Sequence, residues 1–421
     1  MALAEPPKGD ERKRIPWYFS MIPFNMAIGS SSVLTTLVAL SLNASVAEIG
    51  LMVASGAITT IIFSTAWGKL SDRSGIRIKY LIILFVLLGP IFLILSTANS
   101  IQQLILYYTL LAIFSSGVSP IAVMYAVEAC RSRNWQREVA RYNSISSIGT
   151  IFGFVINTFV ALLLHVNWLF YISSILCFFS AFFLWQTAQE SHITLERHAF
   201  PIRHLRDAEH LLSPRPIFHY LDIRKIQIPR NLGKFKPLHL LFLACFIHWL
   251  GIFFFNVGQT PLMKELGLSD SMILAINALS SVVPVVAFGK IVPSLKQDHK
   301  KLINMAIFSR GILIICWGAL STFTTRPFPY IFVLPLLFSV LFPFFYAVLW
   351  LPIITFAISS APEHSKGSIQ GELLSVMAVS NALGSALGGF VMTNLGYIIG
   401  FILAAIISIL ATPIISRINM I

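Results

Sequence analysis

The chain has 421 residues, of which 56% are hydrophobic and 11% are charged, with a mean hydropathy of +0.80 and a formal net charge of +13. So little polar surface excludes a soluble protein of two or three domains and indicates a polytopic membrane protein. The positive charge does not indicate a nucleic-acid binder, because the cations recur in short loops between apolar segments and do not gather on one face.

Twelve apolar segments are predicted to be membrane helices, since about 20 residues cross a hydrocarbon core of ~30 Å. They span 17–40, 47–67, 79–97, 102–127, 142–164, 168–186, 238–260, 271–293, 301–323, 330–357, 369–393 and 397–416. The sequence thus predicts an all-α integral membrane protein with two pseudo-symmetric six-helix bundles. Its expected parts are an N-terminal arm (1–16), a first bundle (17–186), a linker (187–237) and a second bundle (238–421).

The cations predict the sidedness of these helices, because Lys and Arg concentrate in cytoplasmic loops. All but three of the 30 Lys and Arg residues lie in the N-terminal arm, the linker, the C-terminal end or alternate loops. The exceptions are Lys264, Arg310 and Arg326. We therefore expect a multi-pass protein of the cell membrane with both termini in the cytoplasm.

The linker contains five histidines, which we interpret as part of a solvated connector: His192, His198, His204, His210 and His219. Metal binding is the alternative, but their spacing fits neither a helical i, i+4 pair nor a zinc finger. The four cysteines are scattered, with no C-x-x-C pair. No metal site and no cofactor are predicted.

Glycine pairs four residues apart repeat between the halves. Gly149 and Gly153 occupy the same place in the first half as Gly384 and Gly388 in the second. Small residues at this spacing let membrane helices approach closely, so ordinary packing is one explanation and internal duplication is the other.

The stretch Gly68–Lys79 interrupts the apolar sequence with four cations, one acid and two glycines, and we expect a tight turn at the membrane surface. It resembles the loop signature between helices 2 and 3 of the major facilitator superfamily of secondary transporters, although Ile76 departs from the pattern. The matching residues are Gly68, Leu70, Ser71, Asp72, Arg73, Gly75 and Arg77.

The resemblance implies that this loop is a cytoplasmic latch between the halves, formed by Gly68, Asp72, Arg73, Gly75, Arg77 and Glu128. In the family the acid lies against the start of helix 11, and a neighbouring cation meets an acid at the inner end of helix 4. Arg77 with Glu128 is the expected pair here, while Arg131 and Arg133 could compete for Asp72. The second-half loop keeps Gly289 and Lys290 but has Pro293 in place of the acid, so we expect a one-sided latch.

The resemblance also implies a substrate cavity between the halves, lined chiefly by helices 1, 4, 7 and 10. Each of these helices has a polar or aromatic stripe at helical spacing. The candidate residues are Asn25, Ser32, Tyr108, Ser115, Ser119, His248, Asn256, Gln259, Tyr346 and Trp350. Helix packing by small polar residues remains the alternative for the serines.

Arg310 lies well inside an apolar helix, which makes it a functional candidate. The alternative, which we favour, is that its long side chain extends to the inner surface. No acid lies in the middle of a helix, so coupling to protons, if present, is expected to use His248 or a partly buried Glu372, with Arg310 as a further candidate.

The predicted function is secondary transport of a small organic solute by alternating access, with proton coupling left open. A neutral or amphipathic solute is favoured, and Arg310 keeps a monoanion possible. One alternative is a multidrug or metabolite efflux antiporter, and another is a non-transporting membrane sensor or assembly factor. An enzyme is not expected, because no nucleophile with a base, metal cluster or phosphate loop is present. The expected partners are the solute and the lipid bilayer, with protons added if transport is proton-coupled. Nucleic acid is not expected as a partner, and the chain is expected to be a monomer.

Overall fold

The computed structural model describes residues 17–129, 135–188, 237–288, 298–325, 332–360 and 366–418, and most of these residues lie in helices. In the first half these are η1 (Trp17–Ser20), α1 (Met21–Gly29), α2 (Ser31–Ser41), α3 (Val46–Ser74), α4 (Arg77–Ser96), α5 (Ile101–Ser115), α6 (Val118–Ala129), α7 (Trp135–Leu163) and α8 (Asn167–Thr187). In the second half they are α10 (Pro237–Glu265), α11 (Asp270–Val286), α12 (His299–Leu320), η8 (Ser321–Thr325), α13 (Val333–Ser359), α14 (Lys366–Ile409) and α15 (Thr412–Ser416).

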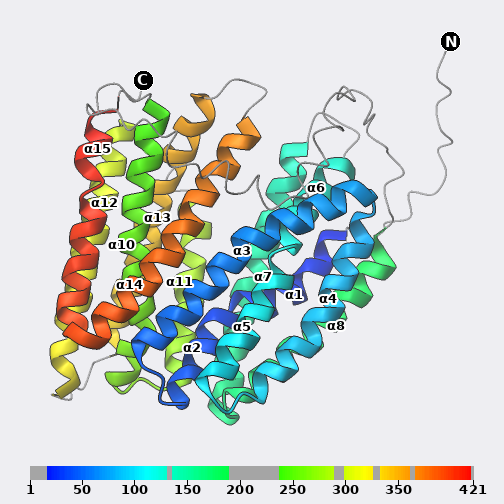
Figure 1. Cartoon of the computed structure of the whole chain (residues 1–421), viewed down its shortest axis with the longest axis horizontal. Helices are drawn as coiled ribbons and strands as arrows, with labels where there is room; N and C mark the ends of the chain where they lie inside the picture. The colour runs from blue at the N-terminus through cyan, green and yellow to red at the C-terminus, as the bar shows by residue number, and fades with distance from the viewer. Residues whose placement is uncertain are drawn as a thin grey trace.

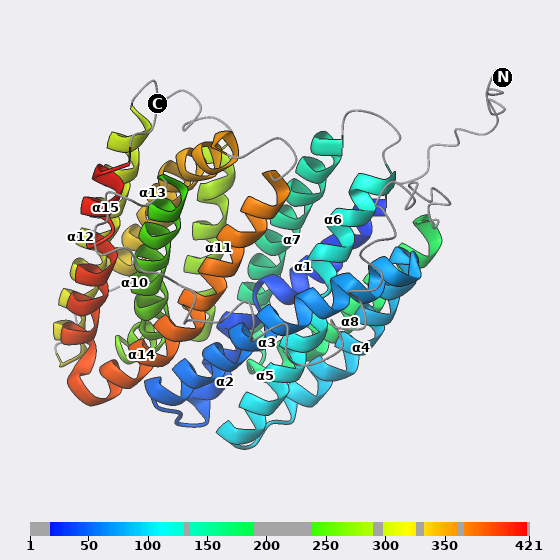
Figure 2. The same ribbon diagram turned by 45° about the horizontal axis from the view of Figure 1, so that its top comes forward.

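The helices gather into two bundles, α1–α8 and α10–α15, which lie side by side in both views (Figures 1 and 2). Ten described segments are long and apolar enough to cross a membrane. One of them, Gly371–Ser416, contains two helices that meet at Gly396, where φ is 82°. Counting that segment twice and adding the shorter α11 accounts for the twelve predicted helices. The predicted all-α membrane fold is confirmed.

The outer surface of the bundles is apolar. Phe159 and Leu163 of α7 are 64% and 85% exposed, and Trp185 of α8 is 68% exposed. Large apolar side chains at this exposure are unfavourable in water and are accommodated by lipid. The exposed apolar side chains are therefore the lipid-facing surface of a membrane protein.

Helix α3 shows how local sequence sets the ends of a membrane helix. It begins with a capping box, in which the Ser45 N–H donates to Glu48 Oε2 at 2.8 Å and Ser45 Oγ accepts from the Glu48 N–H at 3.3 Å. It ends at Gly75, which takes the left-handed conformation (φ 69°) that glycine adopts without steric cost. Its 29 residues span ~43 Å, longer than the hydrocarbon core.

The prediction of a tight turn over the whole of Gly68–Lys79 is therefore wrong in extent. Residues 68–74 are the last turns of α3, and Arg77 already begins α4, so the connection is Gly75 and Ile76. A polar segment can continue as a helix beyond the hydrocarbon, because a helix satisfies its own backbone hydrogen bonds. The polar residues of this stretch indicate where the helix leaves the membrane, but they do not predict where the helix ends.

Two predicted helices are interrupted. The first breaks at Ser30 between α1 and α2, where Asn157 Nδ2 donates to Ser30 Oγ at 2.6 Å. The helix predicted at 102–127 breaks between α5 and α6, and there the indole of Trp67 donates to the Ile113 carbonyl at 2.8 Å. In both places a side chain from another helix bonds to a polar group at the break, as a low-dielectric environment requires.

The bundles are joined mainly where α3 packs on α14 and where α7 packs on α11. The contact of α3 with α14 lies at one end of the molecule, near Asn43, where α2 ends and α3 begins. We call this end the Asn43 face and the opposite end, where α3 meets α4, the Gly75 face. A Cβ built on Gly50 of α3 would lie 2.4 Å from the Ser385 carbonyl oxygen of α14, and one on Gly389 would lie 3.0 Å from the Gly50 Cα. Toward the Gly75 face, Gly68 of α3 and Gly371 of α14 have nothing within 4 Å of such an atom.

Candidate functional site

A cavity of about 390 Å³ lies within the first bundle, between α1, α3, α5, α6 and α7. Most of its lining side chains carry a hydroxyl or an amide, and none carries a charge. The lining residues are Phe24, Asn25, Ile28, Thr60, Ser115, Ser116, Val118, Ser119, Tyr142, Asn143 and Ser146. This lining can exchange hydrogen bonds with a solute without attracting either sign of charge.

A second cavity, of about 250 Å³, lies where the first bundle faces α14. Tyr108 of α5 lines one side, and Ala378 and Asn381 of α14 line the other. The two cavities share the lining residues Ile28, Thr60 and Ser115. The two cavities are therefore neighbours, and together we call them the polar space. Its part inside the first bundle is mostly polar, and the part that reaches the second bundle is more apolar, with Val53 and Leu111 in its lining.

Glycines on α7 set the position of Asn25 in this space. A Cβ on Gly149 would lie 2.8 Å from the Asn25 Cβ, and one on Gly153 would lie 2.3 Å from the Met26 carbonyl oxygen. Because α1 and α7 touch along their backbones, Asn25 Nδ2 reaches Ser146 Oγ at 3.3 Å. The same amide donates to the Met21 carbonyl at 2.8 Å, which orients the side chain along its own helix.

The second glycine pair makes the equivalent contact in the other bundle. A Cβ on Gly384 would lie 2.6 Å from the Leu250 carbonyl oxygen of α10, and one on Gly388 would lie 2.4 Å from that of Phe254. Both pairs therefore bring a helix of their own bundle into backbone contact with another. This shared role supports internal duplication over coincidental glycine content.

A buried polar cluster lies in the second bundle. His248 of α10 is 1% exposed, and its Nε2 lies 3.0 Å from Arg310 Nη1 of α12. Its Nδ1 lies 2.9 Å from Ser408 Oγ of α14. A guanidinium can only donate hydrogen bonds, so Nε2 must accept and the imidazole is neutral with its proton on Nδ1. The hydroxyl of Ser408 then accepts from Nδ1–H.

The prediction that Arg310 extends to the membrane surface is wrong, because its side chain is 2% exposed and lies inside the bundle. Its Cζ lies 4.2 Å from the ring centroid of Phe342 and 5.4 Å from that of Trp249. The register of α12 explains this, since Ile303, Ile307 and Ile314 are buried at helical spacing on the face that carries Arg310. Arg310 therefore points at α10 and α13.

The remaining predicted cavity residues do not gather at one place. Tyr346 and Trp350 stack with ring centroids 6.1 Å apart, next to Trp249. Gln259 Nε2 of α10 donates to Ser339 Oγ of α13 at 3.3 Å. Ser32 and Asn256 are exposed and line neither cavity. By contrast, Asn25, Tyr108, Ser115 and Ser119 are all brought together around the polar space.

At the Gly75 face, two residues of the predicted latch, Asp72 and Arg77, form an ion pair with each other. Asp72 Oδ1 lies 2.6 Å from Arg77 Nη1, which also donates to Ser71 Oγ at 2.9 Å. Arg77 is buried, whereas the Asp72 side chain is 59% exposed. Glu372 is exposed at the start of α14, so its expected partial burial is wrong.

Several predicted contacts lie outside the described residues or side chains. These are the side chains of Arg73 and Glu128, the competing cations Arg131 and Arg133, the second-half residues Gly289, Lys290 and Pro293, the arm at 1–16 and the linker histidines. The Arg77–Glu128 pair and the one-sided latch therefore stay predictions.

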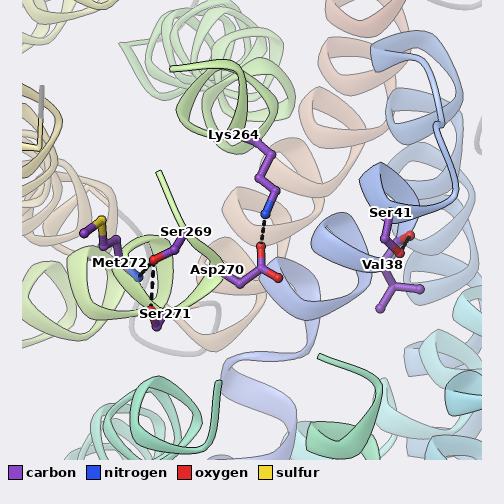
Figure 3. A network of polar contacts seen from close by, with 7 residues as sticks. All are labelled: Val38, Ser41, Lys264, Ser269, Asp270, Ser271 and Met272. Atoms are coloured by element: carbon purple, nitrogen blue, oxygen red, sulfur yellow. Dashed lines mark hydrogen bonds and ion pairs between the residues drawn. The ribbon is translucent and has the colours of Figure 1, made fainter. Parts of the chain in front are cut away.

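At the Asn43 face, the bundles are joined by a further hydrogen bond, from the Ala47 N–H to Thr393 Oγ1 at 2.8 Å. The loop between α10 and α11 is ordered on the same face by an ion pair between Lys264 and Asp270 (Figure 3). Figure 3 also shows Ser269, whose hydroxyl accepts from the Met272 N–H at 3.3 Å and caps α11. Lys264, in the last turn of α10, is thus neutralised by the first residue of α11.

Sequence reasoning missed the contributions of α3, α7 and α14 to the polar space: Thr60, Tyr142, Asn143, Ser146 and Asn381. A signal existed in α7, where Asn143, Ser146 and Thr150 recur at helical spacing next to the Gly149 pair. The resemblance implied a cavity lined by helices 1, 4, 7 and 10, so the stripe on α7 was not predicted to line it.

Comparison with known proteins shows the family to which the chain belongs. The family model of the Major Facilitator Superfamily matches residues 18–377. No curated protein matches the sequence closely enough to add a relative.

Among solved structures, an auto-inhibited POT family peptide transporter is similar with a TM-score of 0.70 and 16% identity, covering 96% of this chain and 98% of that one. The nucleoside transporter NupG has a TM-score of 0.66 and 14% identity, covering 95% and 98%. The xylose transporter XylE from E. coli, in an inward open conformation, has a TM-score of 0.66 and 15% identity, covering 96% and 95%. At these identities, the likeness extends to the fold.

Proposed function

This chain belongs to the major facilitator superfamily of secondary transporters, and from that premise we propose that it carries a small organic solute across a membrane by alternating access. The observation that carries the proposal is the uncharged polar space between α1, α3, α5, α6, α7 and α14. A solute bound there would contact both halves, because Asn381 belongs to the second bundle and Tyr108 to the first.

Helices α3 and α14 are packed together at one end and apart at the other, which supports two alternating states. The two helices touch through Gly50 and Gly389 at the Asn43 face, whereas Gly68 and Gly371 of the same helices have no neighbour within 4 Å of a built Cβ. Rocking one bundle against the other would separate the first pair and bring the Gly75 ends together. The solute site would then be reached from the opposite face.

We further assign the Gly75 face to the cytoplasm, because Lys and Arg crowd the loops on that side. With this sidedness the arrangement corresponds to an inward-open state in the cell membrane, with both termini inside. The two bundles would move as the units 17–186 and 238–421.

The fold does not choose the solute, since the similar structures are named for a peptide, a nucleoside and xylose. The lining favours a solute with hydroxyl, carbonyl or amide groups that bond to side chains such as Asn25, Tyr142 and Asn143. No carboxylate among the described residues lines either cavity, so we assign any proton coupling to His248. A proton on its Nε2 would replace the hydrogen bond from Arg310, which links protonation to the position of the guanidinium.

Solute counterflow in proteoliposomes tests the proposal. A thermal-shift screen of nucleosides, pentoses, dipeptides and organic acids with their amides would first select solutes that bind the purified chain. Asn25→Ala should then lower the counterflow rate roughly fivefold, because it removes a hydrogen bond to the solute. Asn394→Ala is the matched control, since Asn394 makes the same bond to the carbonyl four residues earlier but is exposed outside the cavities.

Two results would count against the proposal. Parental counterflow in both Asn25→Ala and Ser146→Ala would remove the polar space as the solute site. Binding without counterflow for every selected solute would favour a sensor that kept the fold of a transporter.

A further inference from the structure

Arg310 is a buried cation with no anion beside it among the residues that the structure describes. Within the described parts of the chain, no carboxylate forms an ion pair with it, and its bond to His248 is to a neutral imidazole. Aromatic rings surround the guanidinium, with Phe342 at 4.2 Å, Trp249 at 5.4 Å and Tyr346 at 5.9 Å from its Cζ. Ring faces attract a cation but do not neutralise its charge. A membrane interior disfavours such an arrangement unless an anion joins it.

Two hydrogen-bond donors of the cluster are also unused. Arg310 Nε and Trp249 Nε1 are buried, and neither has a hydrogen-bond partner among the described residues. Buried N–H groups in proteins are almost always paired, and a pair of orphaned donors beside a cation suits one acceptor with a negative charge. Both donors belong to the same cluster, because the guanidinium lies over the Trp249 ring.

An aromatic layer separates this cluster from the polar space. Trp249 packs edge-on against Tyr346 and Trp350, and the last two are half-buried. Phe253 continues the layer from Trp249 to α14, where a Cβ on Gly384 would lie 3.1 Å from the Phe253 Cβ. Gly384 is one helical turn from Asn381, which lines the cavity. Phe253 and α14 therefore lie between the Arg310 cluster and the polar space, and a solute that binds at both requires the half-buried rings to move aside.

We propose that the transported solute bears a single negative charge on an apolar or aromatic body, and that Arg310 and Trp249 bind the anion while Tyr346 and Trp350 pack on the body. This inference rests on the proposed function and adds the solute's charge to it. Among the described residues Arg310 is the one cation of its aromatic cluster, and the two cavities add no charge, so a monoanion fits and a dianion does not. The polar groups of the first bundle bind the remaining polar atoms of the solute.

Acid and amide pairs of the same shape test the proposal on the full chain in lipid nanodiscs. The probes are benzoate with benzamide, indole-3-acetate with indole-3-acetamide, and octanoate with octanamide. At least one acid should raise the melting temperature saturably while its amide does not. Arg310→Met should lose this preference, and Arg310→Lys should keep a weaker one because the charge remains.

Trp249→Phe is the variant least able to disturb folding, since it keeps a ring and removes the indole N–H. It should weaken acid binding roughly tenfold, equivalent to about 1.4 kcal/mol. Trp185→Phe is the matched control, because Trp185 lies on the lipid-facing surface, 68% exposed. Equal responses of Trp249→Phe and Trp185→Phe, equal stabilisation by acid and amide, or no response to any acid would each overturn the inference.

The inference can fail separately from the proposed function. Counterflow of a neutral solute at the parental rate in Arg310→Met would overturn the anion site and leave the transporter. Acid-specific binding that depends on Arg310, without counterflow of any solute, would retain the anion site and remove the transport function.

Discussion

Alanine at Gly50 or Gly389 should shift the protein away from the state that is closed at the Asn43 face. A methyl group at Gly389 would lie 2.6 Å from the Val46 carbonyl oxygen, and one at Gly50 would lie 2.4 Å from that of Ser385. Ordinary contact begins at 3.4 Å, so α3 and α14 must separate by about 1 Å. Overpacking of this kind costs ~1–3 kcal/mol, which corresponds to a roughly 5- to 150-fold change in the ratio of two states.

The cost applies to one state, because separating the bundles at the Asn43 face relieves the clash. A reporter cysteine at Ala378, which lines the polar space, would measure the shift in a background lacking the four native cysteines. A membrane-impermeant maleimide applied to one side at a time should label the parent mainly from the Gly75 side. Labelling from the Asn43 side should rise in both alanine variants.

Gly68→Ala and Gly371→Ala are matched controls on the same two helices, because a methyl group at either position meets nothing within 4 Å. They carry the same gain in helix propensity without a clash in this state, and any contact made when the Gly75 ends come together would lower labelling from the Asn43 side and not raise it. The reasoning is refuted if labelling from the Asn43 side is unchanged in Gly50→Ala and Gly389→Ala, or if it rises equally in the two controls.

Three smaller effects concern stability, measured by chemical unfolding in mixed micelles. Asp72→Asn should lower stability by at most about 1 kcal/mol, because Asp72 is largely exposed where it pairs with Arg77, and Asp72→Glu should restore most of the loss. Ser45→Ala should cost ~1 kcal/mol by removing the cap of α3, whereas Ser41→Ala, an exposed serine at the end of α2, should be neutral. Gly153→Ala should cost ~1–3 kcal/mol by pushing α1 from α7, without changing the side from which the cavity is labelled.

The helices could be predicted because their causes are local to the sequence. Apolar length and alternating cationic loops depend on the thickness and the charge asymmetry of the membrane, which act on every segment independently. The ends of helices depend on further contacts. The break between α5 and α6 needs the indole of Trp67, which lies 46 residues before the Ile113 carbonyl that it binds.

Of the residues that line the polar space, the sequence predicted some in the first bundle and none in the second. A helical stripe places Asn25, Ser115 and Ser119 on one face of each helix, and backbone contact at the glycines then brings those faces together. A stripe does not say whether its face meets a cavity, a neighbouring helix or the exterior. Ser32 and Asn256 share stripes with buried residues, yet both are exposed.

Arg310 illustrates what a pattern of residues at helical spacing can and cannot predict. Its burial could have been inferred from the isoleucines at helical spacing in α12, because an arginine on that face cannot reach the surface without leaving its neighbours. Its partners could not, since His248 is 62 residues away in the chain and Ser408 lies 160 residues from His248. Pairings of that range come from the packing of the bundle.

The glycine contacts are of two kinds: contacts within a bundle, which must persist during transport, and contacts between the bundles, which must break. Gly153 and Gly388 join helices within one bundle, so their contacts hold in every state if the bundles move as units. Gly50 and Gly389 join the two bundles at one face, so their contact has to open for the cavity to reach that face. Gly388 and Gly389 are adjacent on α14 and point to different neighbours, Phe254 of the same bundle and α3 of the other. One turn of α14 therefore packs on its own bundle through Gly388 and closes the Asn43 face through Gly389. A substitution at Gly388 should mainly lower the stability of the protein, whereas one at Gly389 should mainly shift the equilibrium between its two states.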